Sequence, residues 1–270
     1  MSPPQDHLTY LQRHVYAGSG IVLDTEKHYL LEARLAPILR ERGLTSLSEL
    51  CDVLRSTQSS PLHSQVVEAM TTNETYFFRE PAHYDALRER ILPGLKEQRA
   101  STRKLTCWSA AASTGQEAYS LAMMLLEMGF DGWSIDILGT DLSPRVLNQA
   151  ASGRYSQLEV NRGLPVTLLL KYFRRVGLDW ELREEVRRMV RFRPFDLRSA
   201  MSTLGPFDLV FCRNVLIYFD LPTKRRVLEE IHRSLFRGGY LIVGTTEAGL
   251  PAGDRFQRQA IGGAVVYVAS

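Results

Sequence analysis

The chain has 270 residues, of which 44% are hydrophobic and 23% are charged, and its formal net charge is +3 at pH 7. This composition excludes a disordered chain and provides enough apolar side chains for one large domain or two smaller ones. Apolar runs are shorter than the roughly 18 residues that a membrane span needs, so we expect no direct membrane insertion. The N-terminal residues lack the basic and apolar segments of a secretory signal, and we therefore expect a cytoplasmic protein.

The three cysteines, Cys51, Cys107 and Cys212, are odd in number and lie far apart in the sequence. Neither a disulfide framework nor a Cys-x-x-Cys zinc site fits this spacing. The six histidines also lack the His-Glu-x-x-His pattern. We therefore expect no metal site, and we expect Cys107 and Cys212, which lie in apolar runs, to be buried thiols.

The positive charge is concentrated in one part of the chain. Residues 1–80 contain 7 Lys/Arg and 10 Asp/Glu, whereas residues 154–198 contain 11 Lys/Arg and 6 Asp/Glu. A net charge of +3 is too small by itself to indicate nucleic acid binding. The Arg-rich stretch 174–193 is either a solvated surface or a docking element, and both interpretations stay open.

Up to residue 72 the apolar side chains recur at helical spacing. These side chains are Leu8, Leu11 and Val15, then Leu31, Leu35, Ile38 and Leu39, then Leu47, Leu50 and Leu54. Segments rich in Gly, Ser or Pro separate the groups near residues 18–20, 42–43 and 56–61. We predict a helical N-terminal domain over residues 1–72, followed by a bridge segment over 73–103 that contains another helix.

From residue 104 onward short apolar strands alternate with helical segments. The predicted strands are 105–109, 135–141, 190–195, 207–212 and 240–245, and the predicted helices are 116–128, 144–151 and 221–236. This alternation predicts a mostly parallel α/β sheet over 104–270, and the residues around Gly262-Gly263 predict a closing antiparallel hairpin. Within the predicted helix 116–128 the spacing also places Met123, Met124 and Met128 in the core.

About forty residues separate helix 144–151 from the strand at 190–195, which is more than a plain crossover requires. This excess length predicts a small basic antiparallel β-hairpin inserted into the α/β domain at about residues 160–192.

Ligands of open parallel sheets bind at the carboxyl ends of the strands. The first such end runs from Ser109 to Glu117, where small residues allow a ligand to approach the backbone and a helix begins. This stretch is neither Gly-x-Gly-x-x-Gly nor a Walker loop, which disfavours a nicotinamide or a nucleoside triphosphate as the ligand.

Two further strand ends carry polar residues. Asp141 closes the second strand at the distance typical of an acidic residue that binds ribose hydroxyls, although it also fits a turn. Because Ser143 and Pro144 account for the next helix start, we expect Asp141 to be available to a ligand. Arg213 and Asn214 follow strand 207–212, whereas Asp208 near its start is predicted to be structural.

Two longer motifs accompany these strand ends. One is Asn73-Glu74-Thr75-Tyr76-Phe77-Phe78-Arg79-Glu80, and the other is Cys212-Arg213-Asn214-Val215-Leu216-Ile217-Tyr218-Phe219-Asp220. With residues 108–120, 139–141 and 195–197, they make the chain resemble CheR, the S-adenosylmethionine-dependent methyltransferase of bacterial chemoreceptors, over almost its whole length. The resemblance implies a helical N-terminal domain followed by a Rossmann-like methyltransferase domain with an inserted antiparallel β-subdomain.

The resemblance also implies a site to which the bridge 73–103 contributes. The residues implied to bind S-adenosylmethionine are Asn73, Thr75, Arg79, Glu117, Asp141, Asp196, Leu197, Arg213 and Asn214. Asp141 would bind the ribose, Asp196 and Leu197 would flank the adenine, and Arg213 and Asn214 would hold the methionine end. Arg79 and Tyr218 are implied to be catalytic, beside the methyl group and the incoming carboxylate. Phe77 and Phe78 are expected to pack in the core.

The implied reaction is methylation of glutamate side chains of membrane-bound chemoreceptors, the methyl-accepting chemotaxis proteins, during adaptation in chemotaxis. The products would be a glutamate methyl ester and S-adenosylhomocysteine. A glutamate is already ionised at pH 7, since its reference pKa is about 4.3, so alignment and water exclusion are the main demands. A nucleic-acid methyltransferase is disfavoured because the loop after strand 207–212 lacks Asn-Pro-Pro-aromatic. A cofactor sensor without catalysis is disfavoured by Arg79 and Tyr218.

The expected partner is the cytoplasmic helical bundle of a chemoreceptor, and the protein is expected to be a monomer that binds no nucleic acid. Family members that tether to a receptor's C-terminal peptide carry a longer, glycine-containing loop in the inserted hairpin. The short turn near residues 176–180 predicts independence of that peptide. The helical domain, which in the family is proposed to grip the receptor through basic residues, is acidic here. Lys27, Arg34, Arg40, Arg42 and Arg55 remain available for such contacts, but the sequence does not show that they share a face.

Overall fold

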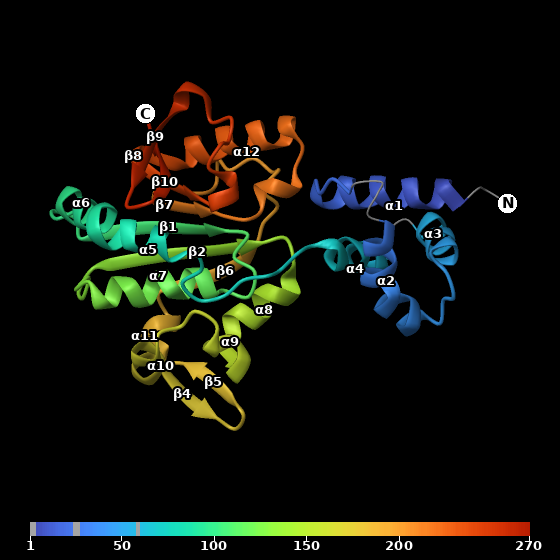
Figure 1. The fold of residues 1–270 in the computed structure, drawn as a ribbon, viewed down its shortest axis with the longest axis horizontal. Coiled ribbons are helices and arrows are strands. Elements are labelled where there is room, and N and C mark those ends of the chain that lie inside the picture. The colour runs from blue at the N-terminus through green and yellow to red at the C-terminus, as the bar shows by residue number, and fades with distance from the viewer. Residues whose placement is uncertain (1–3, 24–27, 58–59) are drawn as a thin grey trace. The chain divides into compact units, whose positions relative to one another are not determined.

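The computed structural model describes residues 4–23, 28–57 and 60–270 (Figure 1). The chain divides into two compact units. The helical unit comprises the residues up to Thr72 together with Tyr218–Thr223, and the sheet unit comprises Asn73–Ile217 and Lys224–Ser270.

The helical unit contains, within its described residues, the helices α1 (Pro4–Ser19), α2 (His28–Arg42), α3 (Leu47–Ser56) and α4 (Pro61–Met70). Ser46 and Ser60 begin α3 and α4 as N-caps, accepting hydrogen bonds from the main-chain N–H groups of Glu49 and Leu62. The apolar stripes meet in one core, formed by Leu11, Val15, Leu31, Leu35, Leu50, Leu54, Leu62 and Val66. The prediction of helices up to residue 72 is therefore confirmed for the described residues.

Basic residues of the helical unit already have partners inside it. Arg34 donates hydrogen bonds from Nη1 to the carbonyl oxygens of Met70 and Thr71, at 2.7 and 3.2 Å. Arg55 pairs with Asp6 at 3.3 Å. Lys27 lies outside the described residues.

The sheet unit is built on a seven-stranded sheet in the order β6-β2-β1-β7-β8-β10-β9. Its strands are β1 (Lys104–Ala110), β2 (Ser134–Asp141), β6 (Val190–Pro194), β7 (Phe207–Cys212), β8 (Leu235–Val243), β9 (Phe256–Ile261) and β10 (Ala264–Ala269). The first five are parallel to one another, and β10 and β9 close the edge antiparallel. The predicted fold class, including the C-terminal hairpin, is confirmed.

The strand order reverses direction between β1 and β7. The chain proceeds from β1 outward to β2 and β6, and then returns to place β7 on the other side of β1. The carboxyl ends of β1 and β7 therefore lie at the switch point of the sheet, where open α/β folds bind ligands.

Helices flank these strands in the sheet unit (Figure 1). They are α5 (Pro81–Ala86), α6 (Leu92–Gln98), α7 (Gln116–Glu127), α8 (Pro144–Ser152) and α12 (Leu221–Ser234). A π-helical turn, η2 (Leu87–Ile91), joins α5 to α6, and 3-10 turns occur at η3 (Leu216–Tyr218), η4 (Thr245–Glu247) and η5 (Gly253–Arg255). The buried core includes Phe77, Leu87, Tyr119, Ile137, Phe211 and Ile242.

One predicted boundary is wrong. The helix expected over 221–236 ends at Ser234, and the strand expected over 240–245 begins at Leu235. Leu235 pairs with Phe207 and the register then shifts before Leu209. A Cβ on Gly239 would lie 3.1 Å from the carbonyl oxygen of Phe207, so glycine permits the close approach of this irregular strand.

The insertion forms a second, three-stranded sheet in the order β3-β5-β4. Its strands are β3 (Arg154–Ser156), β4 (Phe173–Val176) and β5 (Asp179–Leu182), with the short helices α9 (Gln157–Asn161), α10 (Val166–Tyr172) and α11 (Glu184–Arg187) around them. Glu181 on the central strand pairs with Arg174 at 2.6 Å and with Arg154 and Arg187 at 3.7 Å. Part of the basic surplus therefore compensates one carboxylate of the insertion.

Other predicted core positions are confirmed. Met123 and Met124 are buried, Met128 packs against the same core, and Cys107 and Cys212 are buried thiols whose pKa burial raises well above the usual range. Phe77 is fully buried and Phe78 packs beside it. In the described ranges, no helix combines the length and the apolar character needed to cross a membrane.

Candidate functional site

The turn after β1 shapes the first part of the site. Ala111 and Ser113 have φ values of 57° and 50°, a left-handed conformation that is costly for residues with a side chain. Gly115, with φ of 90°, then begins α7. A Cβ there would lie 2.9 Å from the Cβ of Ala150, so the position requires glycine for both space and conformation.

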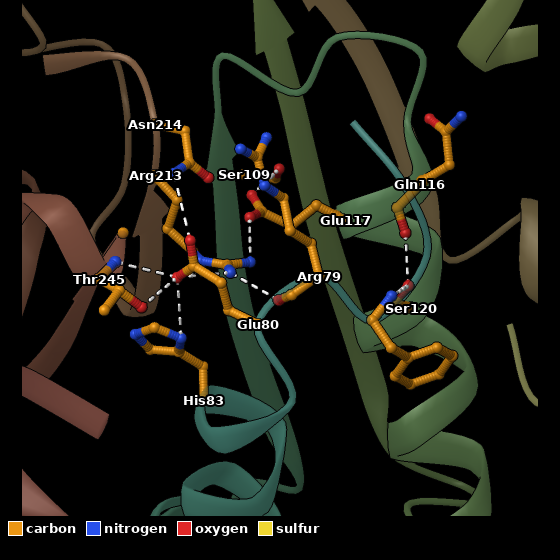
Figure 2. Close-up of polar contacts among 12 residues, drawn as sticks. Arg79, Glu80, His83, Ser109, Gln116, Glu117, Ser120, Arg213, Asn214 and Thr245 are labelled. Carbon is orange, nitrogen blue, oxygen red and sulfur yellow. Dashed lines mark hydrogen bonds and ion pairs between the residues drawn. The ribbon is translucent and has the colours of Figure 1, made fainter. Parts of the chain in front are cut away.

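A buried ion pair joins the first turn of α7 to the end of β7 (Figure 2). Arg213 donates from Nη1 to Oε2 of Glu117 at 3.0 Å, and the Ser109 hydroxyl donates to Oε1 of Glu117 at 2.7 Å. The side chains of Arg213 and Glu117 are 1% and 13% exposed. Burial raises the pKa of Glu117, and Arg213 and Ser109 offset only part of that rise.

A second carboxylate, that of Glu80, meets the same arginine. Glu80 lies 3.2 Å from Nη2 of Arg213, and it accepts hydrogen bonds from Nδ2 of Asn214 at 3.3 Å and from the main chain and hydroxyl of Thr245, both at 3.0 Å. Burial alone would raise the pKa of Glu80, but Arg213 and the hydrogen bonds from Thr245 and Asn214 lower it to about 2. Figure 2 shows the Glu80 carboxylate at the centre of this network, with His83 at 3.2 Å.

Arg79, which precedes Glu80, contributes both its main chain and its side chain. Its carbonyl oxygen accepts a hydrogen bond of 2.6 Å from Nη2 of Arg213. Its guanidinium donates from Nη1 to the carbonyl oxygen of Glu74 at 2.8 Å and lies over the ring of Tyr76, 5.6 Å from the centroid. The segment 73–80 therefore folds back on itself beside the buried ion pair.

Two serines fasten the segment 73–80 to the sheet unit. The Ser113 hydroxyl donates to the carbonyl oxygen of Asn73 at 2.8 Å, and the main-chain N–H of Phe78 donates to the Ser120 hydroxyl at 3.0 Å. The ring of Phe77 packs edge-on against Tyr155, with the centroids 5.0 Å apart. The position of Arg79 is therefore fixed by the β1 turn, by α7 and by the insertion.

Asp141, at the end of β2, forms hydrogen bonds with main-chain groups of two turns, whereas the sequence suggested that the next helix start would leave it available to a ligand. Its Oδ1 accepts the main-chain N–H of Ser143 at 3.0 Å and its Oδ2 accepts that of Ser113 at 2.9 Å. Asp141 thus joins the turn after β1 to the turn after β2, so the expectation that the helix start does not involve it is wrong.

Asp196 and Leu197 follow β6, the neighbour of β2. Phe195 donates its main-chain N–H to the carbonyl oxygen of Asp141 at 2.9 Å, which brings this segment to the end of β2. Arg198 donates from Nε and Nη2 to the Asp196 carboxylate, at 3.0 and 2.6 Å, and the Leu197 side chain is buried.

The structure brings most of the sequence-predicted residues together, in two groups. Arg79, Glu117, Arg213 and Asn214 form the ionic group, and Asn73 meets Asp141 through Ser113. Within the described chain Thr75 forms no hydrogen bond or ion pair with another predicted site residue, and Tyr218 belongs to the helical unit.

Sequence reasoning missed three polar residues at this site. Ser109 donates to Glu117, Glu80 pairs with Arg213, and Glu247 accepts the main-chain N–H of Asn214. Glu80 lies within a recognised motif and Ser109 begins the first candidate loop, so both carried a positional signal. Glu247 lies beyond every motif, and only the fold reveals it.

Comparison with known families agrees with this geometry. The family described as "CheR methyltransferase, all-alpha domain" matches residues 6–71, and the family described as "CheR methyltransferase, SAM binding domain" matches residues 73–261. The chain belongs to the CheR methyltransferase family. Its cofactor is accordingly S-adenosylmethionine (SAM), as the sequence analysis expected.

Relatives of this chain match it over most of their length. Chemotaxis protein methyltransferase 1 of Pseudomonas aeruginosa is 40% identical over 254 residues, which cover 92% of each chain. Chemotaxis protein methyltransferase Cher2 of Pseudomonas putida is 38% identical, with 93% of each chain covered. The chemotaxis protein methyltransferase of Klebsiella aerogenes is 34% identical, with 89% of this chain and 82% of the relative covered.

Proposed function

We propose that this protein methylates glutamate side chains of membrane-bound chemoreceptors in the cytoplasm, as part of chemotactic adaptation. The products are a glutamate methyl ester and S-adenosylhomocysteine. The relatives named as chemotaxis protein methyltransferases support this assignment. The observation that carries it furthest is the buried Arg213–Glu117 pair at the switch point of the sheet, beside Arg79.

The described residues fit SAM. The methionine end of SAM carries an ammonium and a carboxylate, which match the carboxylate of Glu117 and the guanidinium of Arg213. The buried Nε of Arg213 has no acceptor among the described residues, so its donors are not exhausted. In this proposal Asp141 accepts the ribose hydroxyls, Asp196 and Leu197 flank the adenine, and Asn73, Thr75 and Asn214 complete the site.

The chain's own residues have a limited chemical task. SAM supplies a methyl group on a sulfonium, which is already activated for transfer. The substrate glutamate is already ionised at neutral pH, so we assign no general base. Arg79 orients the incoming carboxylate through paired N–H groups, and the Tyr218 hydroxyl donates one further hydrogen bond. Too strong a grip by either group would stabilise the nucleophile and slow the reaction, so their role is alignment.

Replacement of Arg79 by lysine tests this role. Lysine keeps the charge but loses the planar pair of donors, so we expect Arg79→Lys to lower kcat about tenfold or more, measured as methyl transfer to receptor-containing membranes. The control is Arg191→Lys, at a half-exposed ion pair with Asp136, which should keep wild-type turnover. Full turnover of Arg79→Lys would contradict the assignment.

The reaction class is tested by transfer of radiolabelled methyl from SAM to membranes that contain chemoreceptors, followed by mild alkali. We expect labelled methanol to be released from the receptor band, because a carboxyl methyl ester is labile to hydroxide. Label that resists alkali would indicate methylation of nitrogen and would overturn the proposal. So would the absence of label with each chemoreceptor of the source organism while the cofactor still binds.

The proposed partner surface is the cytoplasmic helical bundle of the receptor, bound by a monomer without a receptor tail. The turn between β4 and β5 consists of two residues, Gly177 and Leu178, and this short turn supports independence of a tethering peptide. We expect removal of the receptor's C-terminal tail peptide to leave methylation unchanged within about twofold. A tight and specific complex with the isolated peptide in calorimetry would contradict this prediction.

A further inference from the structure

Glu247 is a buried acid that is not among the residues proposed to bind SAM or the substrate. It is 3% exposed and ends the 3-10 turn η4, immediately after β8. Its carboxylate accepts four main-chain N–H groups: those of Asn214 and Gly244 at Oε2, at 2.6 and 2.9 Å, and those of Val215 and Ile217 at Oε1, at 3.1 and 3.2 Å. These four bonds fill the four lone-pair positions of the carboxylate.

Three of the four donors lie in the segment that follows β7. This segment leaves the sheet at Cys212, so its partly buried N–H groups need acceptors other than a neighbouring strand. Asn214 has a φ of 58°, a left-handed conformation that asparagine tolerates better than most residues and that contacts with the surroundings help to determine. Glu247 supplies that determination, because its shortest hydrogen bond comes from the N–H of Asn214 itself.

The same segment carries the site. Arg213 and Asn214 direct their side chains to Glu117 and Glu80, and Thr245, two residues before Glu247, also donates to Glu80 (Figure 2). Glu80 thus holds the side chains of the segment, whereas Glu247 holds its main chain. Gly244 packs tightly against the side chains of Asn214 and Glu247. A Cβ on Gly244 would lie 2.7 Å from Nδ2 of Asn214 and 2.8 Å from Oε2 of Glu247.

We propose that Glu247 is a positioning residue for the cofactor, which acts by fixing the main chain of residues 213–217 so that Arg213 and Asn214 meet the methionine end of SAM. This inference rests on the proposed function, in which Arg213 and Asn214 bind that end. It adds a residue that touches neither cofactor nor substrate.

The first test is Glu247→Gln. The amide keeps one oxygen, so two N–H groups keep their acceptor, while its NH₂ group faces the other two N–H donors in either orientation. We expect the Kd for S-adenosylhomocysteine, measured by calorimetry on the full chain, to rise at least tenfold. The KM for SAM rises by a similar factor, and kcat at saturating SAM falls less.

A general loss of stability would also follow from changing a buried acid, and Asp208→Asn controls for it. Asp208 is 2% exposed and accepts hydrogen bonds from Arg99 and Thr106 near the start of β7, at the other end of the strand. Both variants should unfold at lower urea concentration than the wild type. Only Glu247→Gln should weaken S-adenosylhomocysteine binding when both are measured well below their unfolding transitions.

Gly244→Ala provides a second route that leaves the carboxylate in place. Its φ of −66° suits alanine, so the added methyl group acts only by displacing Glu247 and Asn214. We expect the same weakening of S-adenosylhomocysteine binding. The control is Gly249→Ala, where a Cβ would meet nothing within 4 Å and where binding should stay unchanged.

The outcomes separate this inference from the proposed function. If Glu247→Gln, or Gly244→Ala where the first variant does not fold, binds S-adenosylhomocysteine within twofold of its control, the positioning role is overturned, whatever the receptor assay shows. If both variants weaken binding but no receptor is methylated by the wild type, the positioning role stands and the proposed function fails.

Discussion

Glu80 and Glu117 bind the same guanidinium, that of Arg213, yet their pKa values move in opposite directions. Glu80 has three further donor contacts, from Asn214 and Thr245, whereas among the described residues Glu117 has one further donor, Ser109, besides the arginine. Burial raises both pKa values, but Glu117 is buried more deeply and has fewer donors, so its pKa stays raised while that of Glu80 is lowered. Glu80 is thus built to stay ionised, and Glu117 leaves room for one more positive group such as an ammonium.

Acid should therefore remove a stabilising contribution of Glu80. Its folded-state pKa of about 2 lies below the ordinary value of 4.5, so the ionised form stabilises the fold above pH 4.5, and this contribution is lost as the pH falls toward 2. We expect Glu80→Gln to lower the free energy of unfolding by about 1–3 kcal/mol at pH 7. The difference from wild type should shrink between pH 4.5 and pH 2, as measured by urea unfolding.

Glu184→Gln is the control for that series, because the Glu184 side chain is 75% exposed and its contact with Arg187 is 3.8 Å long. An exposed pair of this kind is worth about 0–1 kcal/mol, so this variant should follow the wild type at every pH. A constant difference between Glu80→Gln and wild type from pH 7 to pH 2.5 would show that the Glu80 charge does not stabilise the fold.

At the scale of elements, the segment 73–80 shows that a sequence motif can predict the roles of its own residues but not the residues that they contact. Its sequence predicted a functional role for Arg79 and a core position for Phe77, and the core position is confirmed. Its partners Ser113, Ser120 and Tyr155 lie about 40 or more residues away along the chain. Contacts of such separation depend on the topology of the sheet and the insertion, which no local pattern encodes.

The fastening of this segment by α7 can be tested with Ser120→Ala. The change removes the acceptor of the Phe78 N–H, while alanine suits a helix interior. The loss of one buried hydrogen bond is worth about 1 kcal/mol, so we expect the Kd for S-adenosylhomocysteine to rise about fivefold. Amide exchange at residues 77–80 should accelerate.

Ser234→Ala is the matched control for Ser120→Ala. Ser234 is a buried helical serine whose hydroxyl donates to the carbonyl oxygen of Ile231, three residues back in its own helix, much as the Ser120 hydroxyl donates to Gln116, four residues back. It should leave both binding and exchange at residues 77–80 unchanged. Equal effects of the two serine variants would mean that Ser120 stabilises α7 without positioning the segment.

The sequence predicted the strands and most helices correctly because parallel strands are continuous apolar runs and helices carry their own caps. It failed at the α12–β8 boundary, where Leu235 pairs with Phe207 immediately after the helix. It also failed to predict the hydrogen bond from the Ser113 N–H to Asp141. That bond depends on the turn after β1, in which Ala111 and Ser113 are left-handed. Glu247 could not be found, since an acid that binds main-chain N–H groups leaves no pattern of side chains.

At the scale of the whole molecule, one continuous motif is divided between two compact units. Cys212–Ile217 belong to the sheet unit, and Tyr218–Asp220 belong to the helical unit. The main-chain N–H of Val22 donates to the carbonyl oxygen of Tyr218 at 2.9 Å, and the hydroxyl of Tyr16 donates to Asp220 at 2.7 Å. The helical unit therefore holds the main chain at Tyr218, a candidate catalytic residue, in addition to any role in receptor binding.

This division allows the role of the Tyr218 hydroxyl to be isolated. Phenylalanine at 218 keeps the ring that packs on the helical core and the main-chain bond from Val22, so the free energy of unfolding should stay unchanged. If the hydroxyl donates to the incoming carboxylate as proposed, kcat for receptor methylation should fall about tenfold, equivalent to about 1.4 kcal/mol, while the Kd for S-adenosylhomocysteine stays within about twofold. Tyr16→Phe is the control: it removes a hydroxyl from the same unit and should cost about 1 kcal/mol of stability without lowering kcat. An unchanged kcat in Tyr218→Phe would limit Tyr218 to packing and leave Arg79 as the residue that aligns the substrate.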